Sequence, residues 1–150
     1  MANSYTSLLI HIIFSTHKRE RVLPPALRDR LWAYMGGIAR ENQFKALAIG
    51  GTVDHAHMLL SIPAAIPVAK AVQLVKGGSS KWLRETITSF RNFGWQKGYG
   101  AFSIGVSQAD DVAAYIARQE EHHRVKSFQE EYLQFLKEYR IEYDERYIWG

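Results

Sequence analysis

Two histidines separated by one residue, His55 and His57, are the clearest candidates for chemistry in this sequence. Alternate side chains of a strand point to one face, so both imidazoles would lie together, roughly 7 Å apart. The other face would carry apolar residues suited to a core: Ala56, Met58, Leu60 and Ile62. Two imidazoles so placed can converge on one divalent ion. Two polar residues on a half-exposed strand remain the alternative.

A second pair, Tyr115 and Gln119, has helical rather than strand spacing. Residues four apart share one helical face, and alanines around this pair would let another element approach closely. A phenol can act as a nucleophile beside an amide oxygen that binds a metal. The alternative is a tyrosine packed against a sheet and a solvated glutamine. His122 and His123 follow near the same face and could bind a metal, although such neighbours are more often surface residues.

Two groups of basic residues could contact phosphates. The first surrounds a glycine pair and comprises Lys76, Ser79, Ser80, Lys81 and Arg84. Its amines and hydroxyls suit phosphate oxygens, but the spacing of a Walker loop is absent. The second, after the first predicted strand, comprises Lys18, Arg19 and Arg21. Three aromatic residues, Trp95, Tyr99 and Phe102, could stack unpaired bases.

The elements that would position these residues follow a β-α-β-β-α-β order. Apolar and β-branched patterns predict strands over 5–15, 46–49, 55–62 and 101–106. Helical spacing predicts helices opening at Pro24-Pro25, over 67–86, from Ser107 to about His123, and after Ser127. We therefore expect one α+β domain over 1–150. It would be a ferredoxin-like, split β-α-β sandwich with a four-stranded antiparallel sheet and C-terminal helices.

Composition limits the class of protein. The chain has 150 residues, of which 47% are hydrophobic and 23% charged, which is typical of a globular protein. It contains no cysteine, which excludes a thiolate metal site and fits a reducing cytoplasm. No apolar run approaches the ~20 residues of a membrane span, so we expect a cytoplasmic protein without a membrane partner.

Charge is unevenly distributed along the chain. Residues 1–100 carry a net charge of +8 and residues 101–150 a net charge of −4. A basic body with an acidic tail favours a polyanion bound to part of the surface. A solvated face followed by an acidic amphipathic helix would give the same counts.

Four stretches, in this order, resemble the single-tyrosine HUH transposases of the insertion-sequence 200/605 type. They read VDHAHMLLSIP, LVKGGSSKWL, GWQKGYGAFSIG and VAAYIARQEEHH, and the resemblance runs from about Tyr5 to Trp149. It implies an RNA-recognition-motif-like version of the predicted fold. It also implies a homodimer, a divalent metal (Mg²⁺ or Mn²⁺) and single-stranded DNA with hairpin ends as the substrate.

The resemblance also implies a role for each matching position. His55 and His57 fall on the family's metal-binding pair, Gln119 on its third ligand and Tyr115 on its nucleophile, while Asp54 would support the pair. Tyr115 would attack a phosphate to form a 5′-phosphotyrosine link and release a 3′-hydroxyl, which later rejoins DNA. The tyrosine of one subunit would serve the histidines of the other.

Two other functions fit parts of the same pattern. A non-catalytic single-strand binder, including a domesticated relative, would need the basic and aromatic residues but neither the histidine pair nor Tyr115 and Gln119. A metal-dependent hydrolase would need the metal site but an activated water in place of Tyr115.

Overall fold

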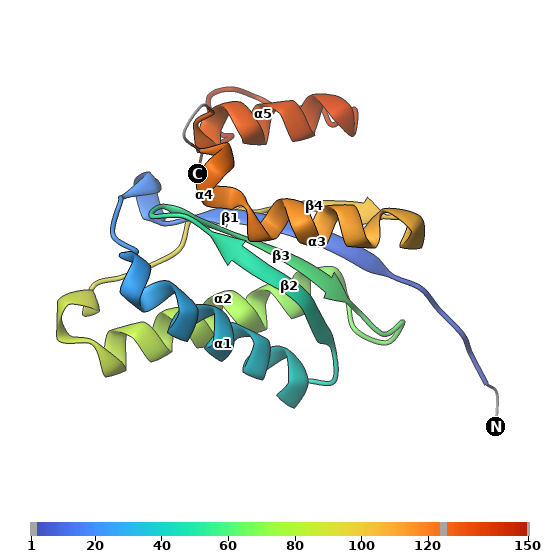
Figure 1. Cartoon of the computed structure of the whole chain (residues 1–150), viewed down its shortest axis with the longest axis horizontal. Coiled ribbons are helices and arrows are strands. Elements are labelled where there is room, and N and C mark those ends of the chain that lie inside the picture. Colours follow the sequence, from blue (N-terminus) through green and yellow to red (C-terminus); the bar gives the residue numbers. More distant parts are fainter. Residues whose placement is uncertain (1–2, 124–125, 150) are drawn as a thin grey trace.

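A four-stranded antiparallel sheet lies between two sets of helices in the computed structural model, which describes residues 3–123 and 126–149 (Figure 1). The sheet order is β2-β3-β1-β4, with β1 and β3 in the centre. The strands are β1 (Leu9–Ser15), β2 (Lys45–Gly51), β3 (His55–Ser61) and β4 (Gly100–Ile104). The helices are α1 (Pro25–Glu41), α2 (Val68–Thr86), α3 (Ala109–Ala117), α4 (Gln119–His122) and α5 (Phe128–Glu138). Three single turns of 3₁₀ helix are η1 (His17–Arg19), η2 (Thr88–Phe90) and η3 (Val106–Gln108).

This order of elements and strands confirms the predicted ferredoxin-like, α+β fold. Several boundaries differ from prediction. The fourth strand ends at Ile104, and Val106 begins the 3₁₀ turn η3. The first strand begins at Leu9, because the residues before it are exposed. The second strand continues through Gly50 and Gly51, beyond its predicted end at residue 49, since both glycines pair with β3. The helix expected to reach His123 is interrupted at Arg118, which divides it into α3 and α4.

α1 and α2 cover one face of the sheet, where the larger apolar core lies (Figure 1). β3 contributes Ala56, Met58 and Leu60 to this core, as its alternating pattern predicted. The glycine pair inside α2 does not break the helix. A Cβ on Gly78 would lie 2.8 Å from the Ile38 side chain of α1, so this glycine lets the two helices approach closely.

α3 lies on the opposite face of the sheet, directly against β2. A Cβ on Gly50 would lie 2.4 Å from the carbonyl oxygen of Ile116, a distance that real Cβ atoms do not reach. The missing side chain therefore allows the backbone of α3 to rest on the strand. This contact sets the height of Tyr115, one residue before Ile116, above the sheet.

α5 covers the same face beside α3 (Figure 1). It begins after Ser127, as predicted, and Ser127 Oγ caps it by accepting a hydrogen bond from the backbone N–H of Glu130 (3.1 Å). A small apolar cluster fixes it to β1 and β4; the buried members are Ile13, Phe102, Phe128, Tyr132 and Leu136. Within the described residues, no helix is both long enough and apolar enough to cross a membrane.

We predict that Gly50→Ala lowers the free energy of unfolding by about 1–3 kcal/mol, because α3 must move away from β2 to admit the methyl group. Urea-induced unfolding measures the change. The matched control is Gly77→Ala in α2, where an added Cβ meets no atom within 4 Å. There the better helix propensity of alanine should raise stability. A Gly50→Ala protein as stable as the wild type would contradict the close packing.

Candidate active site

His55 and His57 both project from β3 toward the face covered by α3 and α5, and both are fully buried. Their ring centroids are 5.2 Å apart. The shared face follows from strand geometry, but the burial does not. It arises because helices from the last third of the chain cover this face, so the half-exposed strand considered as the alternative is absent.

Asp54 fixes the orientation of the His55 ring. Nδ1 of His55 donates to the Asp54 carboxylate (2.8 Å), and the Thr52 hydroxyl lies 3.0 Å from the same nitrogen. Burial acts to raise the pKa of Asp54, but the hydrogen bond and charge of His55 outweigh it and lower that pKa below its usual value. With Nδ1 engaged, Nε2 is left to face the interior of the site.

His57 is supported by a third buried histidine, His11 of β1, whose Nε2 lies 2.8 Å from His57 Nδ1. Burial, together with repulsion from His57, lowers the pKa of His11 to about 3. Burial likewise lowers the pKa of His57 to about 4, against the opposing effect of Glu131. Both rings are therefore neutral at pH 7. The sequence showed His11 only as an interruption of an apolar run.

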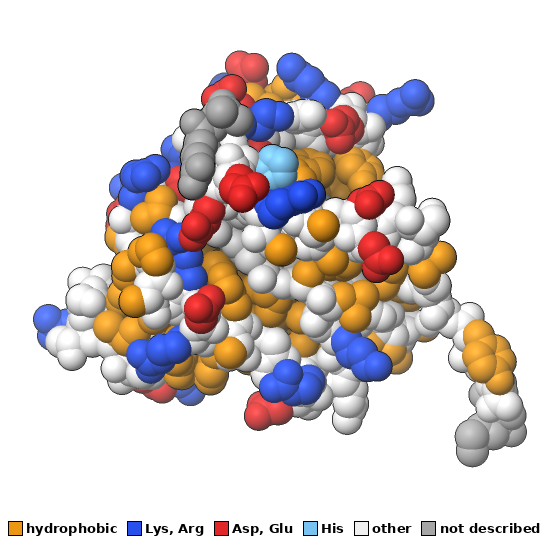
Figure 2. All heavy atoms as spheres, in the orientation of Figure 1, with side chains coloured by type: hydrophobic (Ala, Val, Ile, Leu, Met, Phe, Trp, Pro, Cys, Tyr) orange, Lys and Arg blue, Asp and Glu red, His pale blue; other side chains and the backbone are white. Residues whose placement is uncertain are grey.

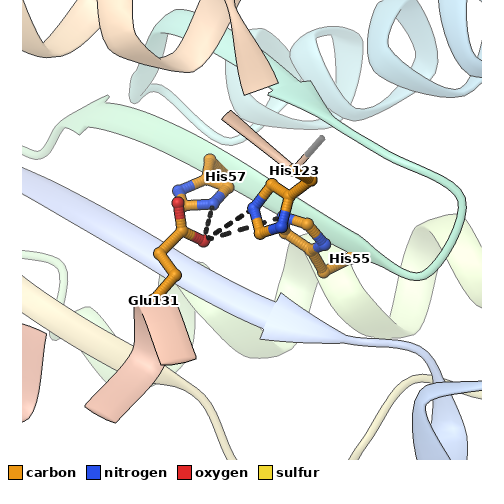
Figure 3. Close-up of side chains that lie close together, drawn as sticks. All are labelled: His55, His57, His123 and Glu131. Carbon is orange, nitrogen blue, oxygen red and sulfur yellow. Dashed lines mark hydrogen bonds and ion pairs between the residues drawn. The ribbon is translucent and has the colours of Figure 1, made fainter. Parts of the chain in front are cut away.

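Glu131 of α5 enters the site from above the sheet and is 2% exposed. Its Oε1 lies 2.9 Å from Nε2 of His57, 3.2 Å from Nε2 of His123 and 3.7 Å from Nε2 of His55. Figure 3 shows the three rings turned toward this one oxygen. From the sequence alone, His123 was named only as a residue that could bind a metal, and Glu131 was not named at all.

Gln119 completes the group of donors. Its side-chain oxygen lies 3.1 Å from Nε2 of His55 and 3.1 Å from Nε2 of His123, and the residue is 1% exposed. The structure thus brings Gln119 to the histidine pair, as the resemblance implied, although the helix is interrupted immediately before it.

Tyr115 lies beside these donors in the same chain. Its hydroxyl donates a hydrogen bond to Oε2 of Glu131, and its ring centroid is 5.8 Å from that of His57. Burial raises the pKa of Tyr115, and the charge and hydrogen bond of Glu131 raise it further, so the phenol is protonated at pH 7. The residue lines a cleft of about 570 Å³ between α3 and α5.

The donor set fits a metal ion. One ligand atom each from His55, His57, His123 and Glu131 lie within 4.8 Å of one another. A four-coordinate ion with ligands at about 2.0–2.2 Å keeps them about 3.4 Å apart, which small shifts of these side chains would reach. Burial acts to raise the pKa of Glu131, but hydrogen bonds from His123, His57 and Tyr115 hold it well below its usual range. The carboxylate is therefore ionised and can act as a ligand.

The basic group that follows β1 lies next to this cluster. Arg19 and Arg21 line a cleft of about 460 Å³ together with Asp54 and His123. Lys18 and Arg19 have positive φ angles of 54° and 57°, a conformation that costs energy for residues other than glycine. On the face seen in Figure 2, Lys and Arg side chains are interspersed with Asp and Glu.

The basic group of α2 lies across the sheet from the cluster. Ser79 and Ser80 are buried, and the Lys76 ammonium donates to the backbone carbonyls of Gln96 (2.6 Å) and Gly98 (2.8 Å). Burial lowers the pKa of Lys76 to about 8. Lys81 and Arg84 are exposed. Of the aromatic residues expected to stack bases, Trp95 and Phe102 are buried in the two apolar clusters.

Fold and site together define a class: an α+β protein with a histidine-rich candidate metal centre beside a tyrosine hydroxyl. The chain belongs to the family described as "Transposase IS200 like", whose family model matches residues 4–119. This match confirms the resemblance found in the sequence. At this level the chain is a transposase, an enzyme that cleaves DNA and transfers strands.

Solved structures of transposases have the same fold. A candidate transposase of Deinococcus radiodurans R1 matches with a TM-score of 0.63 and 22% identity, covering 79% of this chain and 96% of that chain. A REP-associated tyrosine transposase bound to a REP hairpin matches with a TM-score of 0.60 and 14% identity, covering 82% of this chain and 73% of that one. No curated protein matches the sequence.

We predict that the metal-free protein loses stability as the pH falls from about 6.5 to 4. The pKa values of His11 and His57 are lower in the folded chain than the ordinary 6.5, so the unfolded chain takes up protons first. At pH 5, His11 and His57 should each lower the free energy of unfolding by about 2 kcal/mol. Urea-induced unfolding at pH 7.5 and pH 5, with a chelator present, measures this loss.

His11→Gln should remove about half of this pH-dependent loss, while keeping a polar group beside His57. His17→Gln, at an exposed position, is the matched control. An identical loss in wild type and His11→Gln would show that the buried histidine does not cause it.

Proposed function

We propose that this chain cuts and rejoins single-stranded DNA by transesterification, with Tyr115 as the nucleophile beside a divalent metal centre. The observation that carries the proposal is the contact of the Tyr115 hydroxyl with the carboxylate that the three imidazoles also contact. Nucleophile and metal donors thus lie within one hydrogen-bonded group. A hydrolase that uses water would not require this tyrosine.

Different residues of the chain would bind the metal and attack the DNA. His55, His57 and Gln119 are the metal ligands implied by the family. Glu131 and His123 place further ligand atoms within 4.8 Å of those of the histidine pair. A bound divalent ion would supply the positive charge that stabilises a phosphate under attack. The Tyr115 oxygen bonds to phosphorus and gives up its proton to solvent, while the bond from phosphorus to the 3′ oxygen of the preceding nucleotide breaks and that oxygen takes up a proton. The products are a 5′-phosphotyrosine link and a 3′-hydroxyl, whose later attack on the link rejoins DNA.

The substrate strand would approach along two clefts that flank the buried donors. Tyr115 lines one, and Arg19, Arg21 and His123 line the other. Arginines on the second cleft suit the phosphates beside the scissile bond. One structural neighbour is bound to a REP hairpin. We therefore propose that the substrate of this chain is also a single strand with hairpin ends.

We also propose that the site is built within one chain. The alternative is the homodimer implied by the resemblance, in which Tyr115 serves the partner's histidines. Tyr115 contacts Glu131 and lies beside His57 of its own chain, and Glu131 contacts the same histidine. The proposal therefore assigns the nucleophile to the histidines of its own subunit.

We expect the wild-type protein, incubated with Mn²⁺ and end-labelled single-stranded DNA, to form a protein–DNA adduct that survives denaturation. Tyr115→Phe should abolish the adduct, and His57→Ala should reduce it at least 100-fold while largely preserving DNA binding. Binding without cleavage would indicate a non-catalytic single-strand binder. Cleavage without an adduct would indicate a hydrolase.

Mixing the Tyr115→Phe and His57→Ala proteins tests the one-chain site. Each such site retains one defect, so no adduct should appear after subunit exchange has been shown independently. In a site shared between subunits, a mixed dimer would contain one intact site. Recovered adduct formation would then establish the shared arrangement implied by the resemblance.

We predict that Arg19→Gln combined with Arg21→Gln weakens DNA binding and lowers the slope of log affinity against log salt by up to about 1.4, two lost contacts at ~0.7 each for a single strand. The comparison variant is Lys81→Gln with Arg84→Gln, which removes the same charge from α2 across the sheet. An unchanged slope in the first variant and a lower slope in the second would place the strand along α2, with Lys76, Ser79 and Ser80 as its predicted neighbours.

A further inference from the structure

We infer that Glu131 of α5 is itself a ligand of the metal centre, which makes a site of three imidazoles and one carboxylate suited to Mn²⁺, Co²⁺ or Zn²⁺ rather than Mg²⁺. The inference rests on the metal centre of the proposed function and changes its composition. Its other members are His55, His57 and His123. The ligand set implied by the family contained only the first two of these histidines, with Gln119.

The geometry singles out one oxygen. Oε1 of Glu131 lies within 3.7 Å of Nε2 of all three histidines, whereas the Gln119 oxygen is within hydrogen-bond distance of two. Figure 3 shows an interaction from this oxygen to each of the three rings. Four atoms that bind one tetrahedral ion lie around it at about 3.4 Å from one another. The distances from Oε1 to the three nitrogens, 2.9, 3.2 and 3.7 Å, are of this size.

The charges around Glu131 favour a bound cation. The ion pairs of Glu131 among the described residues are all with histidines, none with Lys or Arg. Asp54 adds a second carboxylate on the far side of His55. Burying an ionised carboxylate without a full positive charge is costly. A divalent ion among these side chains would remove that cost, and a carboxylate binds it more strongly than a neutral amide does.

The donor types decide which ion fits. Mg²⁺ prefers an octahedron of oxygen ligands and retains its water, whereas imidazole nitrogens suit first-row transition metals and Zn²⁺. Three of the four donors here are nitrogens, and the site is almost completely buried. The structure therefore favours an ion that binds nitrogen and gives up most of its water.

Glu131 also connects the metal centre to the position of α5. The helix is fixed by Phe128, Tyr132 and Leu136, and it carries Glu131 on the side that faces the histidines. The second carboxylate oxygen accepts the hydrogen bond from Tyr115. A metal-bound Glu131 would thus hold the Tyr115 hydroxyl next to the ion. The family match ends at residue 119, so His123 and Glu131 lie outside the matched segment.

The test is a titration of the metal-free protein with Co²⁺, followed by its visible absorption spectrum. We expect Glu131→Gln to weaken Co²⁺ binding at least tenfold and to alter the spectrum, because one ligand is lost. The matched control is Glu130→Gln, which removes one charge from the same helix and preserves its capping box. Equal or tighter Co²⁺ binding by Glu131→Gln would overturn the inference, because it would mean that the carboxylate only occupies the site and must leave when metal binds.

Hydrogen exchange of the wild-type protein provides a second measurement that does not depend on a variant. If Glu131 is a ligand, Co²⁺ or Mn²⁺ should slow the exchange of backbone amides in residues 128–138, and Mg²⁺ at the same concentration should have a much smaller effect. Unchanged or faster exchange with Co²⁺ would overturn the inference.

These measurements are independent of strand transfer. Tyr115→Phe should retain Co²⁺ binding and the slower exchange of α5, even though it forms no adduct. If the wild type forms no adduct but binds Co²⁺ through Glu131, the proposed reaction fails and the metal site stands. If adducts form but Glu131→Gln binds Co²⁺ normally, the reaction stands and this inference fails.

Discussion

The two-residue period of β3 is the constraint on which the arrangement of this protein depends. Each step along the strand reverses the side chain, so Ala56 and Met58 face the core under α1 and α2 while His55 and His57 face the other side. Because both faces of a central strand must be covered, the second face needs its own helices. The chain uses α3 and α5, and the polar side chains beneath them become a buried site instead of a surface patch.

Two different contacts bring these helices into place. α3 reaches β2 because Gly50 has no side chain, which places Tyr115 and Gln119 close to the histidines. α5 docks through an aromatic cluster on β1 and β4, which brings Glu131 into contact with His57. Residues separated by more than 70 positions in the sequence thus share one site.

The electrostatics of the site explain why it can bind a cation without a cysteine or a cluster of carboxylates. A single ionised glutamate is surrounded by ring nitrogens, and its pKa is held low by the hydrogen bonds that these rings and Tyr115 donate. Outside this group, Asp54 and His11 occupy the remaining nitrogens of His55 and His57. Each ring therefore presents its Nε2 toward the same oxygen.

The sequence by itself determined the order of the elements and the shared face of His55 and His57. It also predicted that Tyr115 and Gln119 lie close together, although the break at Arg118 places them on two helices. These features follow from periods of 2 and 3.6 residues, which are local properties of the chain. Only the tertiary structure decided that Glu131 and His123 join the histidine pair, that His11 supports it, and that Ser79 and Lys76 face the protein interior. Periodicity defines the faces of an element, but which faces meet depends on packing between distant segments, here the docking of α5 and the pairing of β1 with β3.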